Sequence, residues 1–399
     1  MPNLMTSRER MTRALKRQEV DHVPCAFMSF SAMRGRCQDA FEVAERELAM
    51  GLDSMLFIPS SWRGERPNHP DLRGLPVRLP PAVKVDLWIE RLPGEPFPIL
   101  HKEYHTPAGT LTTLVRKTED WPYGNAVPLM GDYQIPRAVK PLITSEADLR
   151  VLQTILQPPS ATEIAALRAE MEQAHAFSAE RGVMVAGGWG VAVDMVGWLC
   201  GLDNMVYLVA DQPQFVEELL ATIAAWNGQR MRAVLEAGVD LFIRRAWYES
   251  ADFWSPRLHR QFLLPNLQKE VALAHEYGTP FGYVMTSNAL PMLDNIREAG
   301  VDVLLGIDPL QQGEAPLVTM RDKLGGRVCL WGGVNGAITV EEGTEDEVRS
   351  AVAYALETMR GVDGFILSPV DNITEITPRA WRNVDVFVKT WAQGVKRET

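Results

Sequence analysis

The sequence of 399 residues predicts an α/β fold, a (β/α)₈ TIM barrel with a β-hairpin inserted after its second strand. Three observations lead to this prediction. Short runs of residues are almost continuously apolar, helical patterns separate most of them, and one helix-to-strand joint recurs. Continuously apolar strands are typical of parallel sheets that are covered on both faces. We therefore interpret residues 1–399 as a single barrel domain.

The recurring joint consists of a glycine, an apolar residue and an aspartate. It is Ala-Met-Gly-Leu-Asp at 49–53, and Glu-Ala-Gly-Val-Asp at both 236–240 and 298–302. Glycine suits the left-handed position that ends a helix, and the residues that follow begin a buried strand. The joint therefore marks the beginning of three predicted strands.

Eight predicted strands follow one another along the chain. They cover residues 23–28, 54–59, 183–187, 240–244, 281–285, 301–307, 327–331 and 364–367. In a barrel built from such strands, the residues that follow each strand converge at the C-terminal mouth, where the chemistry of these folds takes place.

The gap of about 125 residues between the second and third strands is far longer than one helix needs. Residues 83–92 and 102–117 alternate as β-strands do, with a turn at 106–110. Residues 59–81 and 93–98 are rich in proline and glycine, which is typical of irregular segments. We expect residues 60–150 to form an inserted lid whose hairpin lies over the barrel mouth.

Composition excludes several classes of protein. The balance of 40 basic and 51 acidic side chains gives a formal charge of −11, which opposes binding to nucleic acid. The chain has no long apolar segment, and its first residues have the spacing of an amphipathic helix rather than a signal peptide, so we expect a cytoplasmic protein without a membrane partner. Its four cysteines lack C-x-x-C spacing and are expected to be reduced, and no zinc motif is visible among its seven histidines.

The end of the fourth predicted strand is rich in functional groups. Arg244 and Arg245 offer guanidinium groups for an anionic ligand, Tyr248 offers an aromatic wall, and Glu249 is a candidate acid or base. The alternative is an Arg–Glu ion pair that closes the barrel rim. The sequence favours neither interpretation.

Two further carboxylates follow later strands. Asp308 follows the sixth strand and Asp371 follows the eighth. Together with Arg244, Arg245 and Glu249 they are expected to form a ring of charges around one cavity. The alternative for both aspartates is the capping of a following segment, a frequent structural role of this residue.

Other strand ends supply candidate substrate-binding residues. Arg34 follows the first strand and favours an acidic ligand, unless it merely begins an exposed helix. Asp194 follows the third strand within an apolar run, where burial without a partner would be costly. Tyr283 and Trp331 belong to the fifth and seventh strands and complete this set.

One histidine lies on the predicted hairpin. His105 is a candidate base or metal ligand if it points into the cavity, although hairpin histidines more often face solvent.

Several motifs together resemble the uroporphyrinogen decarboxylase superfamily. They are the opening T-S-R-E-R-M-T-R-A-L followed by D-H-V-P, the E-A-G-V-D joints, the long insertion after the second strand, and Thr377-Pro378 after the last strand. The resemblance covers nearly the whole chain. It implies a (β/α)₈ barrel and either a cofactor-free tetrapyrrole decarboxylase or a zinc-dependent methyltransferase that serves a corrinoid protein.

The decarboxylase branch differs from this chain at its reactive positions. Its M-R-Q-A-G-R-Y segment corresponds here to Met-Arg-Gly-Arg-Cys at 33–37, and its catalytic aspartate falls at Ile-Pro-Ser-Ser, 58–61. Its G-H-G segment is replaced by Val-Asp-Asn at 370–372. Because the carboxylate that stabilises charge at the pyrroles is missing, porphyrin chemistry is disfavoured.

The methyltransferase branch resembles this chain more closely. Residues 106–111, Thr-Pro-Ala-Gly-Thr-Leu, are similar to its T-P-x-G-T-L segment. Its usual zinc ligands, an H-x-C and a later cysteine, correspond to Tyr-Val-Met at 283–285 and to Asp371. These side chains are poor replacements for imidazole and thiolate, so zinc remains an open expectation without its usual ligands.

The resemblance therefore implies a methyltransferase or O-demethylase that passes a methyl group from a small donor, such as a methoxylated aromatic, to a corrinoid on a partner protein. Glu249, Asp308, Asp371 and His105 are its candidate acids or ligands. One alternative is a metal-free decarboxylase of uroporphyrinogen or another carboxylated substrate. Another is a non-catalytic corrinoid- or porphyrin-binding protein, and a homodimer is a further open expectation.

Overall fold

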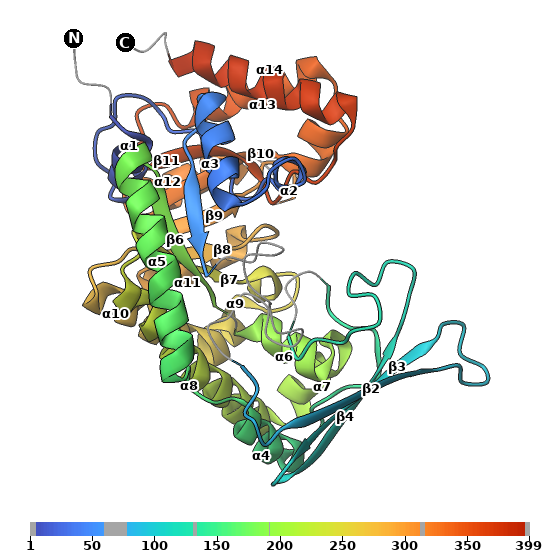
Figure 1. Ribbon diagram of the computed structural model, residues 1–399. Helices are drawn as coiled ribbons and strands as arrows, with labels where there is room; N and C mark the ends of the chain where they lie inside the picture. The colour runs from blue at the N-terminus through green and yellow to red at the C-terminus, as the bar shows by residue number, and fades with distance from the viewer. Residues whose placement is uncertain (1–4, 60–77, 131–133, 191, 312–315, 396–399) are drawn as a thin grey trace.

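A curled parallel sheet and a separate antiparallel sheet form the framework of the computed structural model (Figure 1). The structure describes residues 5–59, 78–130, 134–190, 192–311 and 316–395. The parallel sheet has seven strands, which neighbour one another in chain order. They are β1 (Met55–Ile58), β6 (Met184–Gly190), β7 (Leu241–Arg245), β8 (Phe281–Val284), β9 (Val303–Ile307), β10 (Cys329–Asn335) and β11 (Phe365–Val370).

Seven of the eight predicted parallel strands are thus present, and the exception is the first. Within the predicted strand 23–28, Cys25 forms only an isolated parallel bridge to Leu367. The backbone of this segment is nevertheless paired, because Leu367 N donates to Pro24 O (2.9 Å) and Asp53 N donates to Cys25 O (2.7 Å). Pro24 has no N–H to donate, which prevents a regular ladder on this segment.

Helices cover the parallel sheet along most of the described chain (Figure 1). The α-helices are α1 (Ser7–Leu15), α2 (Ser31–Arg34), α3 (Ala40–Ala49), α4 (Glu146–Ile155), α5 (Ala161–Arg181), α6 (Val193–Cys200), α7 (Leu202–Asp211), α8 (Pro213–Ala237), α9 (Pro256–Leu258), α10 (Leu264–Glu276), α11 (Leu293–Ala299), α12 (Pro316–Leu324), α13 (Glu345–Thr358) and α14 (Pro378–Val395). Shorter 3₁₀ or π turns are η1 (Trp247–Glu249), η2 (His259–Leu263), η3 (Leu290–Met292) and η4 (Gly336–Glu341).

The strands separate two hydrophobic cores. Alternate strand residues, among them Ile243, Leu305 and Trp331, pack with Met11 and Leu15 of α1 in an inner core. The intervening residues pack with the surrounding helices in a larger outer core. Because side chains alternate between the two faces of a strand, successive residues pack in turn into the inner and the outer core.

The three predicted joints have one hydrogen-bonding pattern. The aspartate that ends each joint accepts a hydrogen bond from the backbone N–H at the start of the preceding strand segment, and its own N–H donates to the carbonyl of that same residue. The pairs are Asp53 with Cys25, Asp240 with Val185, and Asp302 with Phe281. Each joint therefore fixes the register of two neighbouring segments.

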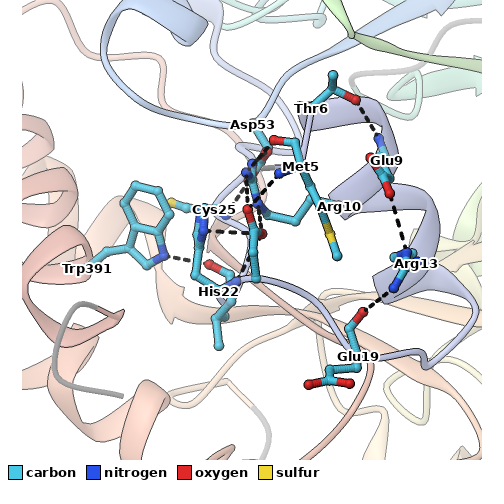
Figure 2. A network of polar contacts seen from close by, with 12 residues as sticks. Met5, Thr6, Glu9, Arg10, Arg13, Glu19, His22, Cys25, Asp53 and Trp391 are labelled. Carbon is cyan, nitrogen blue, oxygen red and sulfur yellow. Dashed lines mark hydrogen bonds and ion pairs between the residues drawn. The ribbon is translucent and has the colours of Figure 1, made fainter. Parts of the chain in front are cut away.

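A polar network holds the first segment against the parallel sheet (Figure 2). Arg10 of α1 binds Asp21 and Asp53, with a distance of 2.6 Å to one oxygen of each carboxylate. Trp391 of α14 donates from its indole nitrogen to Val23 O at 2.8 Å. The opening motif singled out in the sequence thus supplies a structural clamp.

The antiparallel sheet occupies the predicted insertion and is larger than a hairpin. Its order is β2 (Lys84–Glu90), β3 (Ile99–Thr106), β4 (Gly109–Arg116) and β5 (Ala138–Lys140), with a turn between β3 and β4. It lies on the side to which the β1 arrow points and projects away from the parallel sheet (Figure 1). Residues 60–77 of the predicted lid lie outside the described residues.

In the described part of the chain, no single helix is long and apolar enough to cross a membrane, although α6 and α7 pass this test as a pair bent by 103°.

Candidate functional site

The end of β7 forms a buried ion-pair cluster. Arg244 binds Glu249 of η1 and also Glu270 of α10, the latter at 2.7 Å. Tyr283 of β8 donates to Glu249. All four side chains are buried. Because Ile243 faces the inner core, Arg244 points to the opposite face, toward the helices.

Burial and neighbouring charges shift the pKa values of the groups in this cluster. Burial lowers the pKa of Arg244, but Glu249 and Glu270 outweigh that effect and raise it, so the guanidinium stays charged. Burial and the neighbouring Glu249 raise the pKa of Tyr283 well above its ordinary value. His259, 3.5 Å from the Tyr283 hydroxyl, has its pKa lowered to about 4 by burial and then by Arg244, so it is neutral.

Sequence reasoning missed Glu270 and His259. Glu270 lies between the buried Leu267 and Val271 on α10, and a carboxylate within an apolar helix face is a visible signal of a buried partner. His259 begins a π-helical turn that local sequence spacing does not reveal.

Asp194 and Arg245 form a second buried pair. Arg245 Nε lies 2.7 Å from one carboxylate oxygen of Asp194, and Tyr248 N donates to the other oxygen at 3.0 Å. Burial raises the pKa of Asp194, while the Arg245 charge opposes this effect. The sequence argument that a buried Asp194 needs a partner is thus met by Arg245, which lies over the Trp247 ring at 5.0 Å.

The ends of β9, β10 and β11 form a separate and more open cluster. Asp308 accepts hydrogen bonds from Asn335 Nδ2 at 2.6 Å and from the amides of Leu310 and Gln311. The predicted capping role of Asp308 is therefore present. Asp371 is solvent-accessible at a positive φ of 74°, yet protein surrounds it closely enough that burial raises its pKa, and the Asp308 charge raises it further.

Asn372, the residue after Asp371, holds the start of helix α2 in place. It accepts a hydrogen bond from Ser31 N at 3.0 Å and donates to Ser31 Oγ at 2.9 Å. Ser31 begins α2, which ends at the half-buried Arg34. The Asn372 side chain therefore links the end of β11 to α2, the helix that carries the candidate residue Arg34.

The expected ring of charges is divided in the structure. Asp308 follows β9 and Asp371 follows β11, on either side of β10, and the two carboxylates interact electrostatically, whereas Arg244 and Glu249 bind each other on the helix-facing side. The prediction that these four side chains surround one hollow is therefore wrong for Arg244 and Glu249. The Arg–Glu ion pair, the alternative interpretation, is the one observed.

Two other candidates lie elsewhere. His105 is on β3, 3.0 Å from Asp86 and 3.1 Å from Thr110, within the antiparallel sheet. Trp331 is buried in the inner core and donates to Ala26 O at 2.9 Å. Both side chains thus have structural partners.

A groove of about 450 Å³ lies at the outer surface beside α7 and η2, with Trp254 and Phe262 among its lining residues.

The described residues do not fit a zinc site. Among them, no group of three or more histidine, cysteine, aspartate or glutamate side chains is arranged to hold a metal ion. Asp308 is already occupied by three hydrogen-bond donors. Structural zinc sites need four ligands and catalytic ones about three, so this donor set is insufficient.

A curled parallel sheet with polar side chains at the carboxyl ends of its strands is an arrangement found in α/β enzymes, in which the chemistry takes place at those strand ends. The family model for uroporphyrinogen decarboxylase (URO-D) matches residues 127–393, about two thirds of the chain. The chain therefore belongs to the uroporphyrinogen decarboxylase family. Comparison of the sequence with curated proteins gives no significant match.

The chain is similar to solved structures. A methyltransferase from Methanosarcina mazei aligns with a TM-score of 0.59 and 18% identity, covering 98% of this chain and 99% of that one. A B12-independent methionine synthase from Shewanella sp. W3-18-1 aligns with a TM-score of 0.41 and 13% identity, over 57% of this chain and 67% of that one. The first of these similarities covers nearly the whole chain and shows a shared fold.

Proposed function

We propose that this protein is a methyltransferase that removes a methyl group from a small methoxylated donor and passes it to a corrinoid on a partner protein. The observation that carries the proposal is the accessible Asp371 carboxyl, whose pKa is raised beside Asp308 at the end of the parallel sheet. The full-length similarity to a methyltransferase structure favours this branch of the family. We further propose that residues 23–28 complete an eight-stranded barrel as its first segment.

The proposed chemistry is acid catalysis of ether cleavage. The methyl–oxygen bond breaks, and the oxygen that leaves must take up a proton. Asp371 is suited to donate this proton because burial and the Asp308 charge both favour its protonated form. Asn335 and two backbone amides hold the Asp308 carboxylate in place. A corrinoid supplies the nucleophile that accepts the methyl group.

In this proposal, the guanidinium group of Arg34 binds the negative charge of the substrate. Arg34 ends α2, whose first residue is fixed by Asn372 next to Asp371. A guanidinium group favours an anionic donor, such as a methoxylated aromatic carboxylate. Glu249 and Arg244 have a structural role in this scheme, because both are buried and each binds the other and a further buried side chain.

The test is an assay in which absorbance measures the formation of methylcobalamin from cob(I)alamin and methoxybenzoates. We expect Asp371→Asn to lower kcat by about 10²- to 10⁴-fold with a small change in KM. The matched control is Asp363→Asn at the opposite end of β11, which should retain full activity. Because the acid must be protonated, the wild-type rate should fall as pH rises through the raised pKa of Asp371.

A metal-free decarboxylase is the second candidate, supported by the family match itself and by the pair of carboxylates Asp308 and Asp371, near which the described residues form no group that could hold a metal ion. Release of carbon dioxide from uroporphyrinogen, without methyl transfer, would replace the proposal by this alternative. Corrinoid or porphyrin binding that survives Asp371→Asn, with no turnover of either substrate, would instead identify a binding protein.

A further inference from the structure

The edge strand β2 is exposed along its whole length. All seven of its residues are exposed, and β3 is its only neighbour in the sheet among the described residues. The strand projects away from the parallel sheet (Figure 1). Edge strands present unpaired backbone groups, and they are usually protected by proline, bulges or central charges. The sequence of β2, Lys-Val-Asp-Leu-Trp-Ile-Glu, contains no proline, and its pairing with β3 is regular.

One face of this strand is apolar. Val85, Leu87 and Ile89 are 36%, 42% and 44% exposed and alternate along the strand, so they lie on the same face. Val85 and Ile89 pair with the buried Tyr104 and Leu100 of β3, and Leu87 pairs with the buried Lys102, whose amine donates to Val127 O. The exposed strip therefore continues a buried surface that is apolar at both ends, and an exposed apolar strip favours association.

The opposite face is already occupied within the chain. The Trp88 ring stacks on His101 at 4.8 Å, and Asp86 accepts from His105 at 3.0 Å. These contacts hold β2 in an extended conformation before any partner binds. The cost of ordering the strand on association is correspondingly small.

The sequence of β2 is complementary to itself. If two copies pair antiparallel about a two-fold axis at Leu87, Lys84 of each copy lies opposite Glu90 of the other, and Val85 lies opposite Ile89. Asp86 lies opposite Trp88 in this register. Opposite charges meet at both ends of the strand, and the strip of Val85, Leu87 and Ile89 meets its own copy between them. Directly opposed pairs of opposite charge and of apolar side chains stabilise antiparallel sheets.

We propose that β2 pairs with β2 of a second copy of this chain, joining two four-stranded sheets into one continuous sheet. The occupant is a second copy because the charges at the two ends of the strand complement each other only in this antiparallel arrangement. This interface is independent of the proposed activity at Asp371, so either can fail without the other.

The experiment measures the mass of the full chain in solution by light scattering and sedimentation over a range of concentrations. The wild type is expected to be a dimer. Lys84→Glu or Glu90→Lys places like charges opposite each other twice by symmetry, and each should raise the dimer Kd by about tenfold or more. The double variant K84E/E90K restores opposite charges and should restore the dimer. Lys140→Glu, the same charge change on the other edge strand, is the matched control.

A second variant tests the apolar axis. Leu87→Lys places two cations against each other at the centre of the interface and should give a monomer with an unchanged circular dichroism spectrum, because Leu87 is exposed in the single chain. A wild type that stays monomeric at 100 µM would overturn the proposal. A dimer that resists both Leu87→Lys and the single charge reversals would overturn it equally, because it would use another surface.

Discussion

A carboxylate at the end of a strand can serve structure or chemistry, and its partners decide which. Glu249 is completely buried and shared by Arg244 and Tyr283. Asp371 is accessible and has a raised pKa because burial and Asp308 disfavour its charge. The first group therefore balances a buried cation, whereas the surroundings of the second favour its protonated form.

We predict a large loss of stability for one of two matched amide substitutions and almost none for the other. Glu249→Gln should lower the free energy of unfolding by about 3–5 kcal/mol, because it leaves the buried Arg244 with one carboxylate instead of two. Asp371→Asn should change it by less than about 0.5 kcal/mol, since an accessible side chain without a buried partner is replaced. Urea unfolding at pH 7 measures both. Equal losses would contradict the structural assignment of Glu249.

The candidate site was predictable from the sequence in part. The sequence predicts Asp308 and Asp371 at strand ends because apolar runs end there, and the structure places them after β9 and β11, on either side of β10. The face to which Arg244 points was not predictable. It depends on the register of the strand, which shifts between Gly188 and Gly190 in the pairing of β6 with β7. Glu270, its partner, comes from a helix that follows in the chain.

At the scale of elements, the recurring joint explains how neighbouring strands are aligned. Each joint aspartate pairs through its backbone and its carboxylate with one residue of the preceding strand segment. Each carboxylate also meets a basic side chain: Arg10 for Asp53, Arg8 for Asp240 and His275 for Asp302. The glycine two positions earlier, such as Gly300 with φ 79°, allows the helix to end where the aspartate is needed.

Removing one joint carboxylate tests this role. Asp302→Ala should lower the free energy of unfolding by about 1–3 kcal/mol, because the N–H of the buried Phe281 loses its acceptor. Asp302→Asn keeps an acceptor oxygen and should lose less. Asp322→Ala, an exposed aspartate on α12, is the control and should have little effect. Denaturant titration gives the three values, and an Ala variant as stable as the control would contradict the role.

Sequence patterns revealed the elements better than their exact pairing. Seven parallel strands were predicted because buried strands are continuously apolar and their joints recur. The first segment was predicted as a strand on the same grounds, but Pro24 interrupts its ladder. The insertion was predicted as a hairpin, and β5 was missed because three residues are too few to show alternation.

At the scale of the whole molecule, the chain brings its beginning and its end together at the first segment. Arg10 joins α1 to Asp21 and to Asp53 beside β1, and Trp391 of the last helix binds Val23 (Figure 2). Met11 and Leu15 of α1 meanwhile pack into the inner core. Unfolding of this segment would therefore expose the inner core, and the polar network around Arg10 should contribute to global stability.

The pH dependence of stability tests this network. Hydrogen bonds from Arg10 and from Met5 N outweigh the opposing effect of burial and lower the pKa of Asp21 to about 2. A lowered pKa stabilises the fold above the ordinary value near 4, and this stabilisation disappears as pH falls toward 2. Asp21→Asn should therefore cost about 2 kcal/mol at pH 7, and the difference from wild type should shrink between pH 4 and pH 2. Urea unfolding at pH 7, 5, 4 and 3 measures this difference, with the exposed Asp346→Asn as a control that should show none. Because all other titrating groups are common to both proteins, a difference that stays constant with pH would show that the Asp21 charge does not stabilise the clamp.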